Sequence, residues 1–372
     1  MPPGIQGRGV AALARGVQGC ASSYPPSLAA AEPMNQSVPQ PTPAAEYHDV
    51  DPAGFAEIVA RGVPAVLRGA AADWPLVAQA RRSPAALVDY LIGFDSGALA
   101  TTVVAPPAAE GRLVYEEGRK ALNHRHSPEK LPNVLKGLLR QIDAPEPIAI
   151  SLQGLSARDQ FPGLEAENGT VLVPAGTPPR LWIGNKVTVS PHFDAAENLA
   201  FVVAGRRRFT LFPPDQVANL YPGPFDLTPA GVPIAMPAHD APDLARVPRF
   251  AEALAAAFVA DLAPGDAVYV PYLWWHGVQS LDRFNMLVNY WWYSDPVAAE
   301  HPNGAVLRAA FELFRVMPDA HRRAWKPLFD FWVFGSEGDP MAHLPPDLRT
   351  AEPALDAEKI ARFRDAVNAL LK

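Results

Sequence analysis

Residues 187–198 read VTVSPHFDAAEN, and residues 264–281 read PGDAVYVPYLWWHGVQSL. Each stretch sets one histidine among apolar or small residues, although the chain holds only 9 histidines. Side chains alternate between the two faces of a β-strand, so His192 and Asp194 lie on one face of the first stretch. His276 follows a strand and a turn at Pro271 in the second stretch. Antiparallel pairing of the two stretches would bring the three side chains together.

Short runs rich in Val, Phe and Tyr surround both stretches, and Gly and Pro separate them, as is typical of an antiparallel barrel or sandwich. The predicted strands are 63–69, 101–107, 113–117, 149–155, 180–190, 199–205, 207–214, 266–272 and 286–293. The predicted helices are 51–61, with Asp51 as N-cap, 83–94 and 128–142, and helical patterns return after residue 298. We therefore expect a mainly β fold with a helical N-terminal flank and a helical C-terminal tail.

The chain is expected to have three parts. Residues 1–45 are proline-rich and small, which predicts a disordered leader, or a spurious one if translation starts at Met34 instead of Met1. Arginines interrupt every apolar run of this leader, so no targeting segment is expected. Residues 46–297 are expected to form the β-rich domain, and residues 298–372 a C-terminal helical region.

The C-terminal helical region carries a wide apolar stripe. Its members are Leu307, Phe311, Phe314, Trp325, Leu328, Phe329 and Trp332. Such a stripe predicts either packing on the β-rich domain or a homodimer, and the apolar surplus favours the homodimer.

The composition excludes several classes of partner. The net charge is −7 and no run reaches the roughly 20 apolar residues of a membrane helix, so neither a nucleic acid nor a membrane is the expected partner. Cys20 is the only cysteine, which leaves no internal disulfide and no thiolate metal site. We expect a cytoplasmic protein.

Two imidazoles and one carboxylate on a shared face form the ligand set of non-haem Fe(II) oxygenases, in which three coordination positions stay open. The competing interpretation is that each histidine is a hydrogen-bonded core residue, because a His-x-Asp pattern is common by chance. The flanking sequence favours the metal site.

That flanking sequence resembles the Jumonji C (JmjC), or cupin-like, class of 2-oxoglutarate oxygenases. The matching stretches include residues 191–224, 262–281 and 287–296, and the resemblance covers most of residues 60–335. Within the class it is most similar to the branch of the asparaginyl hydroxylase that inhibits hypoxia-inducible factor and its bacterial relatives. The resemblance implies a double-stranded β-helix core of cupin or jelly-roll type, with Fe(II) and 2-oxoglutarate as cofactors.

The same resemblance implies roles for individual residues. His192, Asp194 and His276 match the iron ligands of the family. Arg207 takes the place of a lysine that pairs with the distal carboxylate of 2-oxoglutarate, and a guanidinium can hold a carboxylate through two hydrogen bonds. Asn198 matches an amide that lines the cosubstrate site.

Asn289 matches a second such amide. The chain departs from the family pattern at two other positions. Ser151 stands where the family has a tyrosine that binds the distal carboxylate. Val189 stands where the family has a threonine, with Thr188 and Ser190 beside it and Thr188 counted among the candidate cosubstrate contacts. The site is therefore expected to hold 2-oxoglutarate in a shifted pose or to take another acid.

Several other polar residues have mainly structural interpretations. Arg206 and Arg208 are expected to be solvent-exposed, because alternation puts them on the face opposite Arg207. The other seven histidines occur in loop or polar contexts and are expected at the surface: His48, His124, His126, His239, His301, His321 and His343.

The leading hypothesis is an Fe(II)- and 2-oxoglutarate-dependent oxygenase, a hydroxylase that acts with dioxygen on a C–H bond. The resemblance favours a protein or peptide side chain as the substrate. Two alternatives are kept. One is a metal-binding cupin of another kind, such as an isomerase or a sensor of a small acid. The other is a catalytically silent protein that binds a peptide in the barrel cleft. The sequence leaves the primary substrate open.

Overall fold

A computed structural model describes residues 38–116, 121–225, 227–293, 303–335 and 338–345, together with residues 358, 361, 362 and 365. Its strands are β1 Thr42–Pro43, β2 Ala45–His48, β3 Ala65–Arg68, β4 Leu99–Ala105, β5 Arg112–Leu113, β6 Arg125–Lys130, β7 Ala149–Ser156, β8 Pro179–Gly184, β9 Thr188–Phe193, β10 Glu197–Ala204, β11 Arg207–Phe212, β12 Phe258–Leu262, β13 Ala267–Val270, β14 Trp275–Ser280 and β15 Asn285–Trp292. Its helices are α1 Pro52–Arg61, α2 Pro75–Arg82, α3 Pro84–Ile92, α4 Leu131–Gln141, α5 Ala157–Gln160, α6 Leu164–Glu167, α7 Phe250–Ala256, α8 Asn303–Arg315 and α9 Asp319–Trp332.

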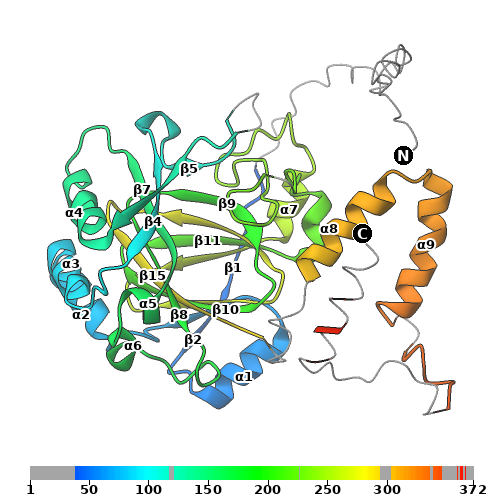
Figure 1. The fold of residues 1–372 in the computed structure, drawn as a ribbon, viewed down its shortest axis with the longest axis horizontal. Helices are drawn as coiled ribbons and strands as arrows, with labels where there is room; N and C mark the ends of the chain where they lie inside the picture. The colour runs from blue at the N-terminus through cyan, green and yellow to red at the C-terminus, as the bar shows by residue number, and fades with distance from the viewer. Residues whose placement is uncertain are drawn as a thin grey trace, which may run out of the picture. The chain divides into compact units, whose positions relative to one another are not determined.

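The strands form two sheets (Figure 1). A six-stranded sheet has the order β1-β12-β11-β14-β9-β5, and a nine-stranded sheet has the order β2-β3-β13-β10-β15-β8-β7-β4-β6. Strands β8 to β15 supply four antiparallel neighbours to each sheet, which is the arrangement of a jelly roll. The predicted mainly β, cupin-type fold is confirmed.

Period-two alternation in the central strands builds two cores from one sheet. On β10, Leu199 and Phe201 face the helices, whereas Ala200 and Val202 face the interior between the sheets. The helix-facing core also contains apolar side chains of α2, α3 and α4, which lie along one side of the nine-stranded sheet (Figure 1). The interior face is therefore the one available for a site.

The helical N-terminal flank follows its sequence signals closely. Helix α1 begins after Asp51, whose side chain accepts a hydrogen bond from the Gly54 backbone N–H at 2.8 Å. The expected helix 128–142 is shorter than predicted, because residues up to Lys130 pair with β4 as the edge strand β6, and α4 starts at Leu131. Proline is tolerated in an edge strand, so Pro128 does not prevent this pairing.

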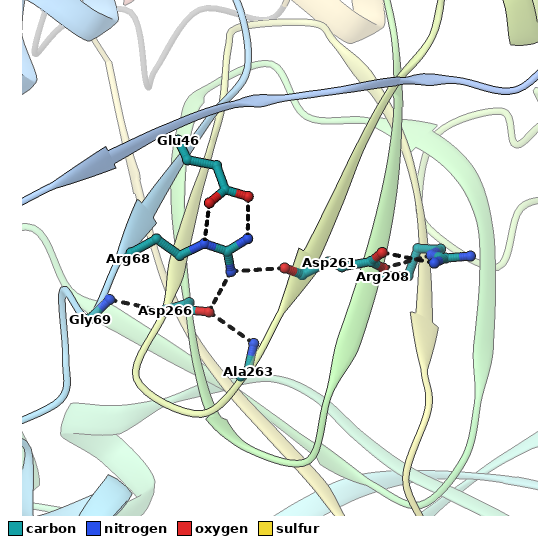
Figure 2. Close-up of polar contacts among 7 residues, drawn as sticks. All are labelled: Glu46, Arg68, Gly69, Arg208, Asp261, Ala263 and Asp266. Carbon is teal, nitrogen blue, oxygen red and sulfur yellow. Dashed lines mark hydrogen bonds and ion pairs between the residues drawn. The ribbon is translucent and has the colours of Figure 1, made fainter.

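Arg68 fastens the N-terminal strands to the jelly roll (Figure 2). Its guanidinium forms a two-pronged pair with Glu46 of β2, donates to a carboxylate oxygen of Asp266 at 2.7 Å, and donates to the Asp261 carbonyl at 2.9 Å. Asp266 also accepts from the backbone N–H groups of Gly69 and Ala263. This network joins β2, β3, β12 and the turn before β13.

The ends of the chain are described only in part. Strand β1 pairs with β12 through Thr42 and Pro43. The first strand therefore lies before residue 46, where we expected the β-rich domain to begin. The rest of the expected leader and most of the last predicted helix lie outside the described residues. Among the described helices, none combines the length and apolar character that a bilayer span requires.

Candidate metal and cosubstrate site

A cavity of about 240 Å³ lies in the interior between the two sheets. Seven of the eight residues proposed from the sequence line it: Ser151, His192, Asp194, Asn198, Arg207, His276 and Asn289. Six of them come from six different strands and Asp194 is the residue just after β9, so the fold gathers side chains that are up to 138 positions apart in the sequence.

The two histidines meet across one strand pair. His276 of β14 lies directly opposite His192 of β9 in the antiparallel register, and their ring centroids are 4.4 Å apart. The Nδ1 of each ring forms a hydrogen bond with the backbone carbonyl two residues earlier, Ser190 at 3.0 Å and Trp274 at 3.1 Å. Nδ1 therefore carries the proton in both rings, and each Nε2 keeps its lone pair for a metal.

Asp194 completes the group. Its Oδ2 lies 3.6 Å from Nε2 of His276 and accepts a hydrogen bond from the Asn198 amide at 3.3 Å. Burial, and after it the charge of His192, lowers the pKa of His276 to about 4, so its imidazole is neutral at pH 7 and suited to a metal.

The donor set fits Fe(II), since two neutral imidazoles and one carboxylate are its usual ligands in non-haem oxygenases. In the described part of the chain, no group of three or more His, Cys, Asp or Glu side chains already has the spacing of a formed metal site. A metal would have to draw the three side chains closer together.

Arg207 is the second unusual feature of the cavity. Its side chain is buried, no carboxylate of the described residues pairs with it, and its Nε has no hydrogen-bond partner there. Among the described residues, the guanidinium forms one hydrogen bond, a long one of 3.5 Å from Nη2 to the Trp182 carbonyl. Burial lowers the pKa of Arg207 to about 10, so it stays charged at pH 7. A buried, unpaired cation is costly, and an anionic ligand would offset that cost.

Arg206 and Arg208 behave as expected. Arg206 is exposed and pairs with Asp282, and Arg208 is exposed and pairs with Asp261. Only Arg207 of the three faces the cavity.

Thr188 is the one proposed site residue that lies elsewhere. It lines a neighbouring cavity of about 200 Å³, together with Arg112, Tyr115 and His239. The register between β9 and β14 shifts by one residue, since His192 faces His276 whereas Val189 faces Val278. This bulge breaks the alternation that would otherwise put Thr188 and His192 on one face.

Three side chains that were not proposed as site residues line the two cavities: Trp182, His124 and His239. Trp182 and His124 line the same cavity as the candidate ligands, and His124 is half-buried rather than at the surface. The expectation that His239 is exposed is wrong, because only 4% of it is exposed and it packs against Gly277. A Cβ at Gly277 would lie 2.7 Å from its Nε2. Strand alternation could have revealed Trp182, but no sequence signal marks His239.

Comparisons with known proteins give a consistent family. A family model described as Cupin-like domain matches residues 52–298, about two thirds of the chain. HSPB1-associated protein 1 of Rattus norvegicus is 32% identical over 168 residues, 44% of this chain and 32% of that protein. Lysine-specific demethylase JMJ31 of Arabidopsis thaliana is 34% identical over 126 residues, 32% of this chain and 22% of that protein.

Lysine-specific demethylase 8 of Danio rerio is 33% identical over 112 residues, 30% of this chain and 26% of that protein. The chain thus spans about a third or less of the length of these relatives. None of the three names is that of an asparaginyl hydroxylase, so the finer placement within the class stays a prediction. The chain belongs to the cupin-like, JmjC-type domain family, a family of the Fe(II)- and 2-oxoglutarate-dependent oxygenase type.

Proposed function

We propose that this protein is an Fe(II)- and 2-oxoglutarate-dependent oxygenase. His192, Asp194 and His276 would hold the iron, and Arg207 would bind the distal carboxylate of 2-oxoglutarate. The observation that supports this most strongly is the buried, unpaired Arg207 in the same cavity as the three candidate ligands. A cation at one end and a metal-ligand set at the other match a dicarboxylic keto acid.

The side chains between these two ends would shape the reaction. Iron, when bound, supplies the activation of dioxygen, with 2-oxoglutarate as the co-reductant. Apolar residues line the cavity between the polar groups, among them Ala200, Phe209, Val278 and Leu287. They would exclude water, while Arg207 fixes the keto acid in one orientation. Ser151 lines the same cavity and would supply a smaller polar contact than a tyrosine.

The proposed reaction is hydroxylation of a C–H bond, with a protein or peptide side chain as the substrate. Support comes from relatives whose names refer to a protein partner or to lysine demethylation, which also starts from C–H oxidation. We also propose a cytoplasmic location, on the basis of the single cysteine.

A homodimer through α8 and α9 is part of the proposal. Apolar side chains of both helices are largely exposed, including Leu307 (51%), Leu328 (47%) and Trp332 (54%). Burial of such a stripe is favourable at about 25 cal/mol per Å² of apolar surface. Light scattering of the purified chain should give the mass of two copies, and Leu328→Glu should give the mass of one.

The ligand assignment is tested by His192→Ala and Asp194→Ala. Both variants should lose Mn(II) binding in anaerobic titrations and should form no succinate from 2-oxoglutarate with Fe(II) and oxygen, because two donors cannot replace three. Circular dichroism should show an intact fold. His321→Ala, an exposed position on α9, is the matched control and should behave as the wild type.

The outcomes separate the alternatives. Unchanged succinate formation in either variant contradicts the ligand assignment. A wild-type chain that binds Mn(II) but never turns over 2-oxoglutarate supports a non-oxygenase cupin. A wild-type chain that binds no metal supports a silent peptide-binding protein.

A further inference from the structure

Three polar side chains project into the interior from neighbouring strands of the nine-stranded sheet. Trp182 belongs to β8, Asn289 to β15 and Asn198 to β10. In the antiparallel register, Leu287 faces Trp182 and Ala200 faces Asn289, so the three polar side chains are diagonal neighbours. Diagonal pairs on one face of a sheet are within reach of long side chains.

Hydrogen bonds join these side chains into a single chain that ends at Asp194. The Trp182 indole Nε1 donates to Oδ1 of Asn289 at 2.9 Å. The Asn289 amide nitrogen donates to Oδ1 of Asn198 at 3.3 Å. The Asn198 amide nitrogen donates to Oδ2 of Asp194 at 3.3 Å. Each link donates toward the carboxylate.

The direction of this chain is determined by its two ends. An indole N–H can only donate, and an ionised carboxylate can only accept. If the Asn289 amide were reversed, its NH₂ group would face the Trp182 N–H. If the Asn198 amide were reversed, its oxygen would face Asp194. Only one orientation of both amides satisfies every link, so Trp182 selects it from the far end.

We infer that Trp182, Asn289 and Asn198 are positioning residues that orient the carboxylate of Asp194 for the metal. This inference rests on the proposed function. It changes the role expected for the two asparagines from contacts of the cosubstrate to supports of a metal ligand. Groups that hold metal ligands in place typically contribute a factor of 10–100 to metal affinity.

Burial makes the chain difficult to replace. Asn198 and Asn289 are 4% and 2% exposed, so water cannot easily take over a lost hydrogen bond. The carbonyl of Trp182 also accepts a hydrogen bond from Arg207, so this one residue adjoins both the candidate carboxylate-binding group and the support of the candidate ligand.

The test is Mn(II) affinity measured without 2-oxoglutarate, so that contacts to the cosubstrate cannot contribute. Trp182→Phe keeps an aromatic ring but removes the only donor at the start of the chain, and should weaken Mn(II) binding about tenfold. Asn198→Ala, which removes the direct donor to Asp194, should weaken it more. Trp292→Phe is the control, because Trp292 packs on Phe55 and Tyr269 and its indole forms no hydrogen bond with the side chains of the Trp182–Asp194 chain.

A double-mutant cycle sharpens the test. Once Asn198→Ala has broken the last link, adding Trp182→Phe should cost little more, so the two losses should be clearly non-additive. Unchanged Mn(II) affinity in Trp182→Phe, or fully additive losses, overturns the inference. Loss of 2-oxoglutarate affinity alone, with Mn(II) affinity intact, would return the asparagines to a cosubstrate role. Failure of the wild type to bind Mn(II) would instead contradict the proposed function.

Discussion

Arg68 and Arg207 are both arginines of the jelly-roll sheets, but their surroundings are opposite. Arg68 contacts two carboxylates and a carbonyl, and every contact comes from the protein itself (Figure 2). Arg207 is more deeply buried, yet it has no carboxylate partner among the described residues. Arg68, which is partly exposed, thus has the more complete set of partners within the protein, although the more buried Arg207 has the greater need of them.

The pKa values of the two arginines reflect the same contrast, since that of Arg68 is raised and that of Arg207 is lowered. The hydrogen bonds that Arg68 donates to Glu46 are the largest cause that raises the pKa of Arg68, whereas burial alone lowers the pKa of Arg207 to about 10. A cation whose partners all belong to the protein serves the fold. A buried cation without protein partners costs folding free energy, and an anionic ligand would offset that cost.

The largest expected effect is that of Arg207→Met. Loss of a charge-assisted, two-pronged hydrogen bond should raise the KM for 2-oxoglutarate about 100-fold, or roughly 2.8 kcal/mol. The ligand-free variant should unfold at an equal or higher denaturant concentration than the wild type, because an unpaired buried charge is removed. Steady-state kinetics and urea titrations measure the two effects.

Arg208→Gln is the matched control for Arg207→Met. Arg208 is the next residue of β11, but it is exposed and bonded to Asp261 at 2.6 and 2.8 Å. Surface pairs of this kind contribute about 0–1 kcal/mol, so both measurements should stay near those of the wild type. A marked loss of stability in Arg207→Met would mean that Arg207 serves the fold as Arg68 does.

The alternation of side chains along the strands predicted that Arg207 points into the interior and that His192 and His276 lie close together. Strand alternation is a property of a few consecutive residues, and two apolar strands on the same buried face have few registers available. The N-cap at Asp51 was predictable for the same reason, since it needs only the three residues that follow.

Tertiary contacts determine what the sequence could not predict. The location of Thr188 depends on a bulge between two strands whose paired residues are 82 to 91 positions apart. The link between Trp182 and Asn289 joins residues 107 positions apart and requires the register of β8 and β15. His239 is buried only because a loop crosses Gly277, where the missing side chain leaves room for the ring.

Arg68→Met should have the next largest effect, and it should change the stability of the fold and not the binding of 2-oxoglutarate. It leaves Glu46 and Asp266 without their cation, which should lower the free energy of unfolding by about 2 kcal/mol. Partial exposure of the pair with Glu46 keeps the loss below that of a fully buried pair. The KM for 2-oxoglutarate should not change, because Arg68 does not line the cavity that holds Arg207 and the candidate ligands. A raised KM with unchanged stability would erase the contrast between the two arginines.

His239 tests the same principle with a group that can lose its charge. Like Arg207, it is buried with an unpaired nitrogen, but burial lowers its pKa from the usual 6.5 to about 4. Between these two pH values the unfolded chain takes up a proton that the folded chain does not, so stability is complete above pH 6.5 and falls toward pH 4.

Lowering the pH from 7.5 to 5 should therefore remove about 2 kcal/mol of stability through His239, and His239→Phe should lack that part of the loss. Urea titrations of the metal-free proteins at both pH values measure the difference, since the contribution of His276 is present in both chains and cancels. The two proteins should show parallel behaviour above pH 7.5. Parallel curves down to pH 5 would mean that His239 gains a partner when it is protonated. In that case a buried nitrogen without a hydrogen-bond partner in the structure would not by itself identify a group that stays unpaired when it is charged. The role proposed for Arg207 would then have to be supported by binding of its ligand alone.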